Sequence, residues 1–283
     1  MFKSLFSRRL AGRLILFLLV VLLIASAGIY SSLKKATAQT SVHLTMGNPS
    51  GATTNAANYD NYLMVKTQYA LSYSDSNSTP NWVSWQLNSS WLGSAPRQDN
   101  FREDTTLPAG YYRVTSSDYT GSGYDRGHMC PSADRTNTVA NNSATFLMTN
   151  IVPQAPDNNQ GYWAQLENYA RTLVTQQGKE LYIIAGGYGY GGTIANGYIT
   201  VPERLFKIIV VTNPGTGTGG VNTNTRVIAI DTPNTQGNRS ANWGAFRTTV
   251  DYIESQTGYD FLSNISTSVQ SVIESRVDNG PTS

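Results

Sequence analysis

The chain has 283 residues, 40% of them hydrophobic and only 13% charged, a composition that can build a full core and argues against intrinsic disorder. Six of its 20 basic residues precede residue 39, where there is no acidic residue, which leaves 14 basic residues against 18 acidic ones in the body. An acidic body argues against a protein that coats nucleic acid through its overall charge, although a local basic cleft remains compatible. A single cysteine, Cys130, excludes a disulfide within the chain.

The first 38 residues have the pattern of a leader. A basic stretch precedes the apolar run at residues 14–30, which is short for a membrane-spanning helix and slightly long for a signal peptide. Small-x-small sequences occur at residues 25–27, near the end of the run, and at residues 36–38, after it. We expect residues 1–38 to be either a signal peptide or an uncleaved membrane anchor. In both cases the body is expected to be exported, as a periplasmic or secreted protein or one anchored to the membrane by residues 14–30.

The body is expected to mix strands and helices in one domain. A polar lead-in at 39–60 precedes a domain at 61–275 and a tail at 276–283, with Pro80 in a connection and loops at 185–192 and 213–223. The pattern predicts strands at 61–74, 82–88, 180–186, 199–212 and 226–231, and helices at 160–177 and, with a break at Gly258, 248–275. Because no βαβ unit repeats, we predict an α+β fold with a mixed, largely antiparallel sheet flanked by helices.

Residues 125–135, DRGHMCPSADR, contain one of only two histidines in the chain. We expect this segment to be a loop in which His128 serves as a general base, with activity falling below about pH 6.5, the ordinary histidine value. Gly127 would allow close approach to a ligand. The alternative is a structural histidine, with Asp125 and Arg126 pairing with each other or with the charged residues at 134 and 135.

Asn159 and Glu167 lie eight residues apart, the first at the start of the helix predicted at 160–177 and the second within it. In a regular helix that spacing is a rise of roughly 12 Å and about 80° beyond two turns, too far for both to hold one ion directly. A neutral asparagine oxygen suits Mg²⁺, which keeps most of its waters, and Glu167 could act on such a water. The alternatives are a surface pair between Glu167 and Arg171, and Asp157 as the ligand.

Two further residues have both a chemical and an ordinary interpretation. Arg97 could contact phosphate oxygens in a bidentate manner, or be one of several exposed arginines. A nucleophilic Cys130 would need histidine and acid partners, and packing is the simpler reading. The chain contains no Walker loop, HExxH, CxxC or GxSxG motif, which argues against nucleotide hydrolases, zinc peptidases and lipases.

The segment at 125–135, followed by TNIVPQAPDNNQGYWAQLE at 149–167, resembles the DNA/RNA non-specific endonucleases, which are nucleases of the ββα-metal type. The likeness covers roughly residues 60–265. It implies a ββα-metal motif that carries the active site, and one Mg²⁺ or Mn²⁺ ion per site. By that resemblance the general base is His128, the direct metal ligand is Asn159, the residue that holds metal-bound water is Glu167, the group that stabilises the transition state is Arg97, and the supporting residues are Arg126 and Asn150.

The resemblance implies hydrolysis of single- and double-stranded DNA and RNA to 5′-phosphorylated products. All of the expected chemistry is at phosphate, which carries no base or sugar information. Two other functions remain open: a catalytically silent, exported nucleic-acid-binding relative, and a secreted phosphodiesterase for small nucleotides. Plasmid degradation with and without EDTA distinguishes the first of these from a nuclease, and turnover of a small chromogenic diester without polymer cleavage would identify the second.

Overall fold

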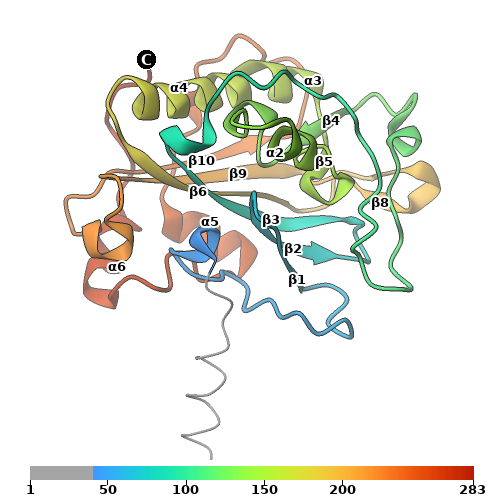
Figure 1. The fold of residues 1–283 in the computed structure, drawn as a ribbon, viewed down its shortest axis with the longest axis horizontal. Coiled ribbons are helices and arrows are strands. Elements are labelled where there is room, and N and C mark those ends of the chain that lie inside the picture. The colour runs from blue at the N-terminus through green and yellow to red at the C-terminus, as the bar shows by residue number, and fades with distance from the viewer. Residues whose placement is uncertain (1–40) are drawn as a thin grey trace, which may run out of the picture. The chain divides into compact units, whose positions relative to one another are not determined.

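A six-stranded antiparallel sheet lies at the centre of residues 41–283, the part of the chain that the computed structural model describes (Figure 1). In spatial order its strands are β1 (Tyr62–Val65), β2 (Ala70–Ser74), β3 (Thr79–Leu87), β6 (Glu180–Tyr188), β9 (Arg204–Thr212) and β10 (Val227–Pro233). Every neighbouring pair is antiparallel. The predicted α+β fold with a largely antiparallel sheet is therefore confirmed.

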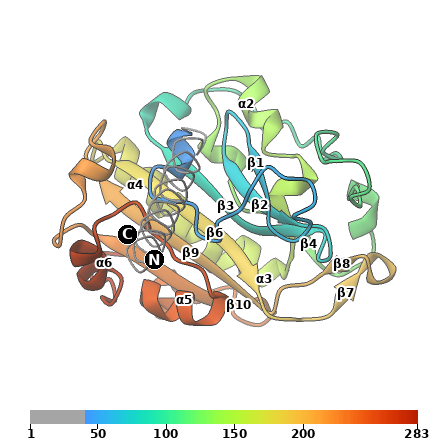
Figure 2. The ribbon, with the colours of Figure 1, turned by 90° about the horizontal axis from the view of Figure 1, so that it is seen from below.

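Helices cover both faces of this sheet. Figure 1 shows α2 (Val139–Ala144), α3 (Pro156–Asn158) and α4 (Ala164–Thr175) on one face, and α5 (Val250–Thr257) and α6 (Thr267–Ile273) on the other. Figure 2, seen from below, shows α5 and α6 beneath the same strands. The expected leader or anchor at 1–38, with its apolar run at 14–30, lies outside the described residues. Within 41–283, no helix combines the length and apolar character that crossing a membrane requires.

The apolar run of β9 is explained by burial on both faces. Leu205 and Ile209 belong to the core under α4, whereas Phe206, Ile208 and Val210 belong to the core under α5 and α6. This alternation follows from the two-residue period of a strand. The same geometry points the side chain at position 207, a lysine, toward α4.

Helix α4 has the predicted apolar face and the predicted end. Trp163, Leu166, Ala170, Leu173 and Val174, all at helical spacing, are buried. Gly178 terminates the segment at a φ of 62°, and its N–H donates to the Val174 carbonyl over 3.2 Å. Glycine adopts this left-handed conformation without the steric cost that a Cβ imposes. The helix therefore packs on the sheet with its polar side outward.

The expected loop at 185–192 was wrong for its first four residues, because β6 continues to Tyr188. A Cβ on Gly186 would lie 2.3 Å from the Asn81 carbonyl oxygen, and one on Gly187 would lie 2.6 Å from Cβ of Pro202. These glycines allow close packing against neighbouring chain segments. In the sequence alone, a run of glycines has the composition of a loop.

Other predicted elements were divided more finely by the structure. The strand at 61–74 is the hairpin β1–β2, and the helical stretch at 248–275 is α5 and α6 with Gly258, at a φ of 71°, ending the first. The 199–212 strand is β9 preceded by the short β8 (Ile199–Thr200), which pairs with β7 (Thr193–Ile194). Pro80 lies in β3, not in a connection. It sits opposite Tyr73 at a register shift, before the β3–β6 pairing begins, so no ladder bond to β6 is lost.

The segments at both ends of the described chain pack against the domain. Met46 and Ala52 of the expected lead-in are buried in the core beneath α5 and α6. In the expected tail, Asp278 forms ion pairs with Arg226 over 2.8 Å and with Arg247 over 3.0 Å. Residues 41–283 thus form one compact unit.

Candidate active site

The DRGH sequence forms a strand, β4 (Asp125–His128), and not the expected loop. It pairs antiparallel with β5 (Ile151–Gln154), and α3 and α4 follow directly, which gives a ββα arrangement. Strand alternation places the side chains of Arg126 and His128 on one face. A Cβ on Gly127 would lie 2.1 Å from Oε1 of Gln154, so this glycine makes room for a neighbouring strand and not for a ligand.

His128 is buried, with 9% of its surface exposed, between two aromatic rings. Its ring centroid lies 5.3 Å from that of Phe101 and 4.8 Å from that of Phe146, the latter edge-on. Neither ring nitrogen makes a hydrogen bond within residues 41–283, and the buried Nε2 has no partner there. Burial lowers the pKa of His128 to about 3, and the charges of Arg97 and Arg126 act in the same direction. The imidazole is therefore neutral, which is the form of histidine that a general base requires.

Two arginines flank this imidazole. The Arg97 guanidinium lies 4.8 Å from the Phe146 centroid and donates to Ser132 over 2.9 Å. The Arg126 guanidinium lies 4.3 Å from the Phe101 centroid and donates to Ser116. The structure thus brings Arg97 next to Arg126 and His128, which belong to one strand about thirty residues further along the chain. A neutral base between two cations is suited to an anionic substrate.

Asn150 supports the site through the backbone. Its Nδ2 donates to the carbonyls of Cys130 and Thr145, and its Oδ1 accepts from the Cys130 N–H, each over 2.9 Å. The side chain is fully buried. Because both ends of the amide are occupied, Asn150 fixes the chain that follows His128 and does not reach a substrate. It is a positioning residue.

Asn159 is held in place by Asp125. Its Nδ2 donates to Asp125 Oδ2 over 2.8 Å, and the neighbouring Gln160 donates to the same oxygen over 2.8 Å. No hydrogen bond among residues 41–283 uses Asn159 Oδ1 or Asp125 Oδ1. An oriented, unoccupied amide oxygen beside a carboxylate is a donor set that fits a hard divalent cation.

The helix between Asn159 and Glu167 is not regular, so the helical spacing assumed for these residues was wrong. Residues Asn159–Trp163 form a π turn, with Gly161 at φ −101° and ψ −118°. A Cβ on Gly161 would lie 2.5 Å from the Arg239 carbonyl oxygen, which requires glycine at this point. π turns inside helices occur often at functional sites.

Glu167 forms an ion pair with Lys207, whose Nζ lies 3.2 Å from Oε1. Lys207 is 1% exposed and its Nζ lies 4.0 Å from the centroid of Trp163. Burial raises the pKa of Glu167, and Lys207 and Arg171 partly oppose that shift. Arg171 itself pairs with Asp134 over 2.7 Å, so the surface pair between Glu167 and Arg171 is not formed.

The structure therefore places the predicted residues in two groups. The first contains His128, Arg97 and Arg126, with Asn150 behind them. The second contains Asn159, held by Asp125, and Glu167, held by Lys207, one in the π turn and the other in α4. The pairings first suggested for Asp125, Arg126, Asp134 and Arg135 are absent among the ion pairs of residues 41–283. Cys130 is fully buried and burial raises the pKa of its thiol to about 12, so the nucleophile reading is wrong.

Sequence reasoning missed the roles of Asp125 and Lys207. A signal was present for each. Asp125 is part of the same motif as His128, and Lys207 is the only charged residue in the apolar run at 205–211. A lone charge in a strand buried on both faces needs a partner, and the partner here is Glu167.

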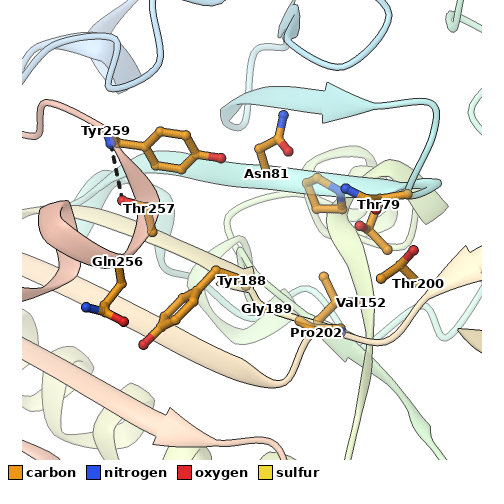
Figure 3. A pocket seen from close by; sticks show the side chains of 13 residues that line it. Thr79, Asn81, Val152, Tyr188, Gly189, Thr200, Pro202, Gln256, Thr257 and Tyr259 are labelled. Atoms are coloured by element: carbon orange, nitrogen blue, oxygen red, sulfur yellow. Dashed lines mark hydrogen bonds between the residues drawn. The ribbon is translucent and has the colours of Figure 1, made fainter. Parts of the chain in front are cut away.

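Two cavities among the described residues differ in whether charged side chains line them. A cavity of about 190 Å³ lies where β3 begins and β6 ends. It is lined only by uncharged residues, among them Tyr188, Gln256 and Tyr259 (Figure 3). It offers no cation for a phosphate group. A cavity of about 500 Å³ is bounded by Asp125 and Arg126 and by the 116–120 segment. This second cavity adjoins the candidate site.

Comparison with known proteins gives a consistent answer. Residues 46–268 match the family model described as DNA/RNA non-specific endonuclease. The chain is 56% identical to a nuclease from Nostoc sp. over 274 residues, 95% of this chain and 99% of that protein. It is 30% identical to human mitochondrial endonuclease G over 217 residues, 72% of this chain and 70% of that protein. A crystal structure of the EndoG/EndoGI complex matches with a TM-score of 0.67 at 21% identity, covering 81% of this chain and 95% of that one.

The fold and the ββα site, together with these similarities, define a nuclease. The chain belongs to the DNA/RNA non-specific endonuclease family, whose members depend on a metal ion. The resemblance read from the motifs at 125–135 and 149–167 is thereby confirmed.

Proposed function

We propose that this protein is an endonuclease that hydrolyses phosphodiester bonds of single- and double-stranded DNA and RNA and leaves 5′-phosphorylated products. One observation carries the proposal: the neutral imidazole of His128 has no hydrogen-bond partner within residues 41–283 and lies beside the guanidinium groups of Arg97 and Arg126. A base and two phosphate-binding cations in one place are what in-line attack on a phosphodiester requires.

In this mechanism His128 takes a proton from the attacking water as the new phosphorus–oxygen bond forms. Arg97 and Arg126 bind the non-bridging oxygens and stabilise the additional negative charge that develops on them. The bond to the 3′ oxygen breaks, and that oxygen takes up a proton from solvent. The phosphate stays on the 5′ side of the break, which gives the expected products.

We propose that Asn159 holds one Mg²⁺ or Mn²⁺ ion directly and that Glu167 holds it through water. The bound ion supplies Lewis-acid stabilisation of the phosphate and leaving oxygen. The carboxylate of Asp125 orients the Asn159 amide so that Oδ1 is free for this purpose. Lys207 favours the charged form of Glu167, in which both oxygens accept hydrogen bonds from water.

Recognition through phosphate explains the proposed breadth of substrate, because phosphate contacts carry no sequence information. The two arginines provide a local cationic site on a body whose charged residues are predominantly acidic. This combination favours cleavage at many positions over tight coating of nucleic acid.

The experiment is a cleavage assay with the purified full chain on supercoiled plasmid, single-stranded DNA and RNA, each with Mg²⁺, Mn²⁺ or EDTA. We expect all three polymers to be cut with either metal and none with EDTA, and fragment ends to accept a kinase label only after phosphatase treatment. No cleavage at all would identify a silent nucleic-acid-binding relative. Turnover restricted to a small chromogenic diester would identify a phosphodiesterase of small nucleotides.

We also propose that the protein is exported, on the basis of the basic stretch and the apolar run at 14–30. Mass spectrometry of the native protein should find an amino terminus beyond residue 25, or the intact chain in membranes if the segment is an anchor. Intact chain that begins at Met1 and is free in the cytosol would contradict export. A protein inhibitor is a related proposal, supported by the structural relative EndoG, which was crystallised in an inhibited complex with EndoGI.

A further inference from the structure

Three carboxylates meet on the face of the sheet opposite the candidate active site. Asp251 and Glu254 belong to α5, and Glu274 directly follows α6. One carboxylate oxygen from each lies within 4.8 Å of the other two. The Asp251 N–H donates to the Glu274 carbonyl over 3.1 Å, which fixes the two helices relative to each other. Figures 1 and 2 show α5 and α6 on the face opposite α4.

Glu274 is the unusual member of this cluster. It is only 6% exposed, and its Oε1 is buried with no hydrogen-bond partner within residues 41–283. None of the ion pairs formed among those residues involves the three carboxylates. Burial raises the pKa of Glu274 to about 8, and the neighbouring charges of Glu254, Asp251 and Asp260 add to the shift. An unpaired carboxylate in such a place requires either a proton or a cation.

The spacing of the oxygens suits a large, hard cation. Ca²⁺ binds oxygen at 2.3–2.6 Å, so two of its ligands can be as far apart as roughly 5 Å, whereas Mg²⁺ at 2.0–2.1 Å allows only about 4.2 Å. The spread of up to 4.8 Å falls within the first limit. Glu254 uses Oε1 to accept from the Phe261 N–H over 2.7 Å, which orients its other oxygen without occupying it. Asp251 is exposed and opens the cluster to solvent, which provides access for the ion and waters to complete the coordination.

We propose that Asp251, Glu254 and Glu274 form a Ca²⁺ site that joins α5 to the end of α6. The ion neutralises the buried carboxylate and ties together two helices that cover one face of the sheet. This site is separate from the proposed nuclease centre. Its role is stability and not chemistry, so it does not depend on the proposed function.

The test is the thermal unfolding midpoint of the full chain, measured in EDTA and then with increasing Ca²⁺ or Mg²⁺. At about 100 times the dissociation constant, Ca²⁺ should raise the midpoint of the wild type by about 5–10 °C. Glu274→Gln should abolish this rise, and in EDTA it should be about as stable as the wild type, because glutamine replaces a carboxyl group that carries a proton when no cation is bound. Mg²⁺ should act only at much higher concentration.

Two variants serve as controls, and a third changes a second ligand of the cluster. Glu103→Gln removes the same charge from an exposed position outside the cluster, and it should keep the full Ca²⁺ response. Asn159→Ala removes the proposed catalytic ligand and should also keep it. Asp251→Asn changes an exposed ligand whose side chain makes no hydrogen bond or ion pair within residues 41–283, and it should weaken the Ca²⁺ response even if Glu274→Gln does not fold.

A wild type whose midpoint does not respond to Ca²⁺ would overturn the inference, since a proton then occupies the cluster. A response that survives in both Glu274→Gln and Asp251→Asn would place the ion elsewhere. A response lost in Asn159→Ala but kept in the cluster variants would show binding at the nuclease centre alone. Calorimetric titration should count one fewer Ca²⁺ in Glu274→Gln than in the wild type.

Discussion

The surroundings of the two histidines differ more than their burial does. His43 is 3% exposed and His128 is 9% exposed, and burial is the main cause that lowers their pKa values, to about 4 and about 3. Yet His43 uses both ring nitrogens, one with the Thr67 carbonyl over 2.8 Å and one accepting from the Gln86 N–H over 3.1 Å. His128 uses neither within residues 41–283.

This difference separates a structural histidine from a chemical one. A buried imidazole whose two nitrogens are both hydrogen-bonded holds chain segments together and has no nitrogen left to accept a proton from a substrate or water. A buried imidazole without such partners has lost the hydrogen bonds that water supplies in the unfolded chain. This loss destabilises the fold, and unsatisfied buried groups of this kind occur often at functional sites. The pKa shift alone does not distinguish them, because both histidines are shifted in the same direction.

The largest expected effect is on catalysis by His128. His128→Ala should reduce plasmid cleavage by about 10²–10⁴-fold, the usual contribution of a general base, while the protein remains folded. Initial rates of cleavage and the circular dichroism spectrum check this. Folded His128→Ala that cuts at the wild-type rate would falsify the assignment.

The next effect separates Asn159 from Glu167. Glu167→Gln should lower turnover by about 10–100-fold with an unchanged metal midpoint, because a residue that acts through metal-bound water affects position and not binding. Asn159→Ala should raise the metal concentration needed for half-maximal rate, and added Mg²⁺ should restore part of the activity. If the metal titrations of Asn159→Ala and the wild type superimposed, Asn159 would not be the direct ligand. Asp157 would then be the next candidate for that role.

The pH dependence should differ from that of an ordinary histidine. Because the pKa of His128 is lowered, kcat/KM, which reports the free enzyme, should stay level as the pH falls through 6.5 and decline only at lower pH. A bound phosphate offsets the charges of Arg97 and Arg126, so the decline of kcat should begin at higher pH than that of kcat/KM. If kcat and kcat/KM both declined near pH 6.5, the pKa of His128 would not be lowered in the protein.

The smallest effect on catalysis is expected at His43. His43→Ala removes a buried side chain together with its bonds to the Thr67 carbonyl and the Gln86 N–H, and it should lower the free energy of unfolding by about 2–4 kcal/mol. The folded-state pKa of His43 is lowered, so its stability contribution is complete above the unfolded value of 6.5 and is lost as the pH falls toward about 4. Urea unfolding at two pH values should show a weaker pH dependence in the variant. The kcat of the folded fraction should match the wild type, and a large loss would mean that His43 reaches the site.

The periodic elements could be predicted from the sequence, and the conformations set by distant contacts could not. The apolar face of α4 and the continuous apolar run of β9 are properties of short windows. The strand at Asp125–His128 was missed because glycine and charged residues have low strand propensity, and pairing with β5 overrides it. The π turn at Gly161 depends on the approach of Arg239, which lies far along the chain.

The same division applies to the site. Apart from Arg97, the site residues came from two short motifs, but their partners came from the fold. The bond between Asn159 and Asp125 spans 34 residues, and the pair between Lys207 and Glu167 spans 40. Local patterns carry no information about such pairs, and only the lone charge of Lys207 in an apolar run gave an indication.

Cys130, two residues after His128, gives the molecule a built-in reporter. Its thiol is fully buried, and its backbone is held at both ends by Asn150. A thiol reagent can therefore reach it only when the segment beside the active site opens, so the labelling rate measures the opening free energy of that segment without an introduced probe. Since this is the only cysteine, the signal has one source, and reducing agents have no disulfide within the chain to break.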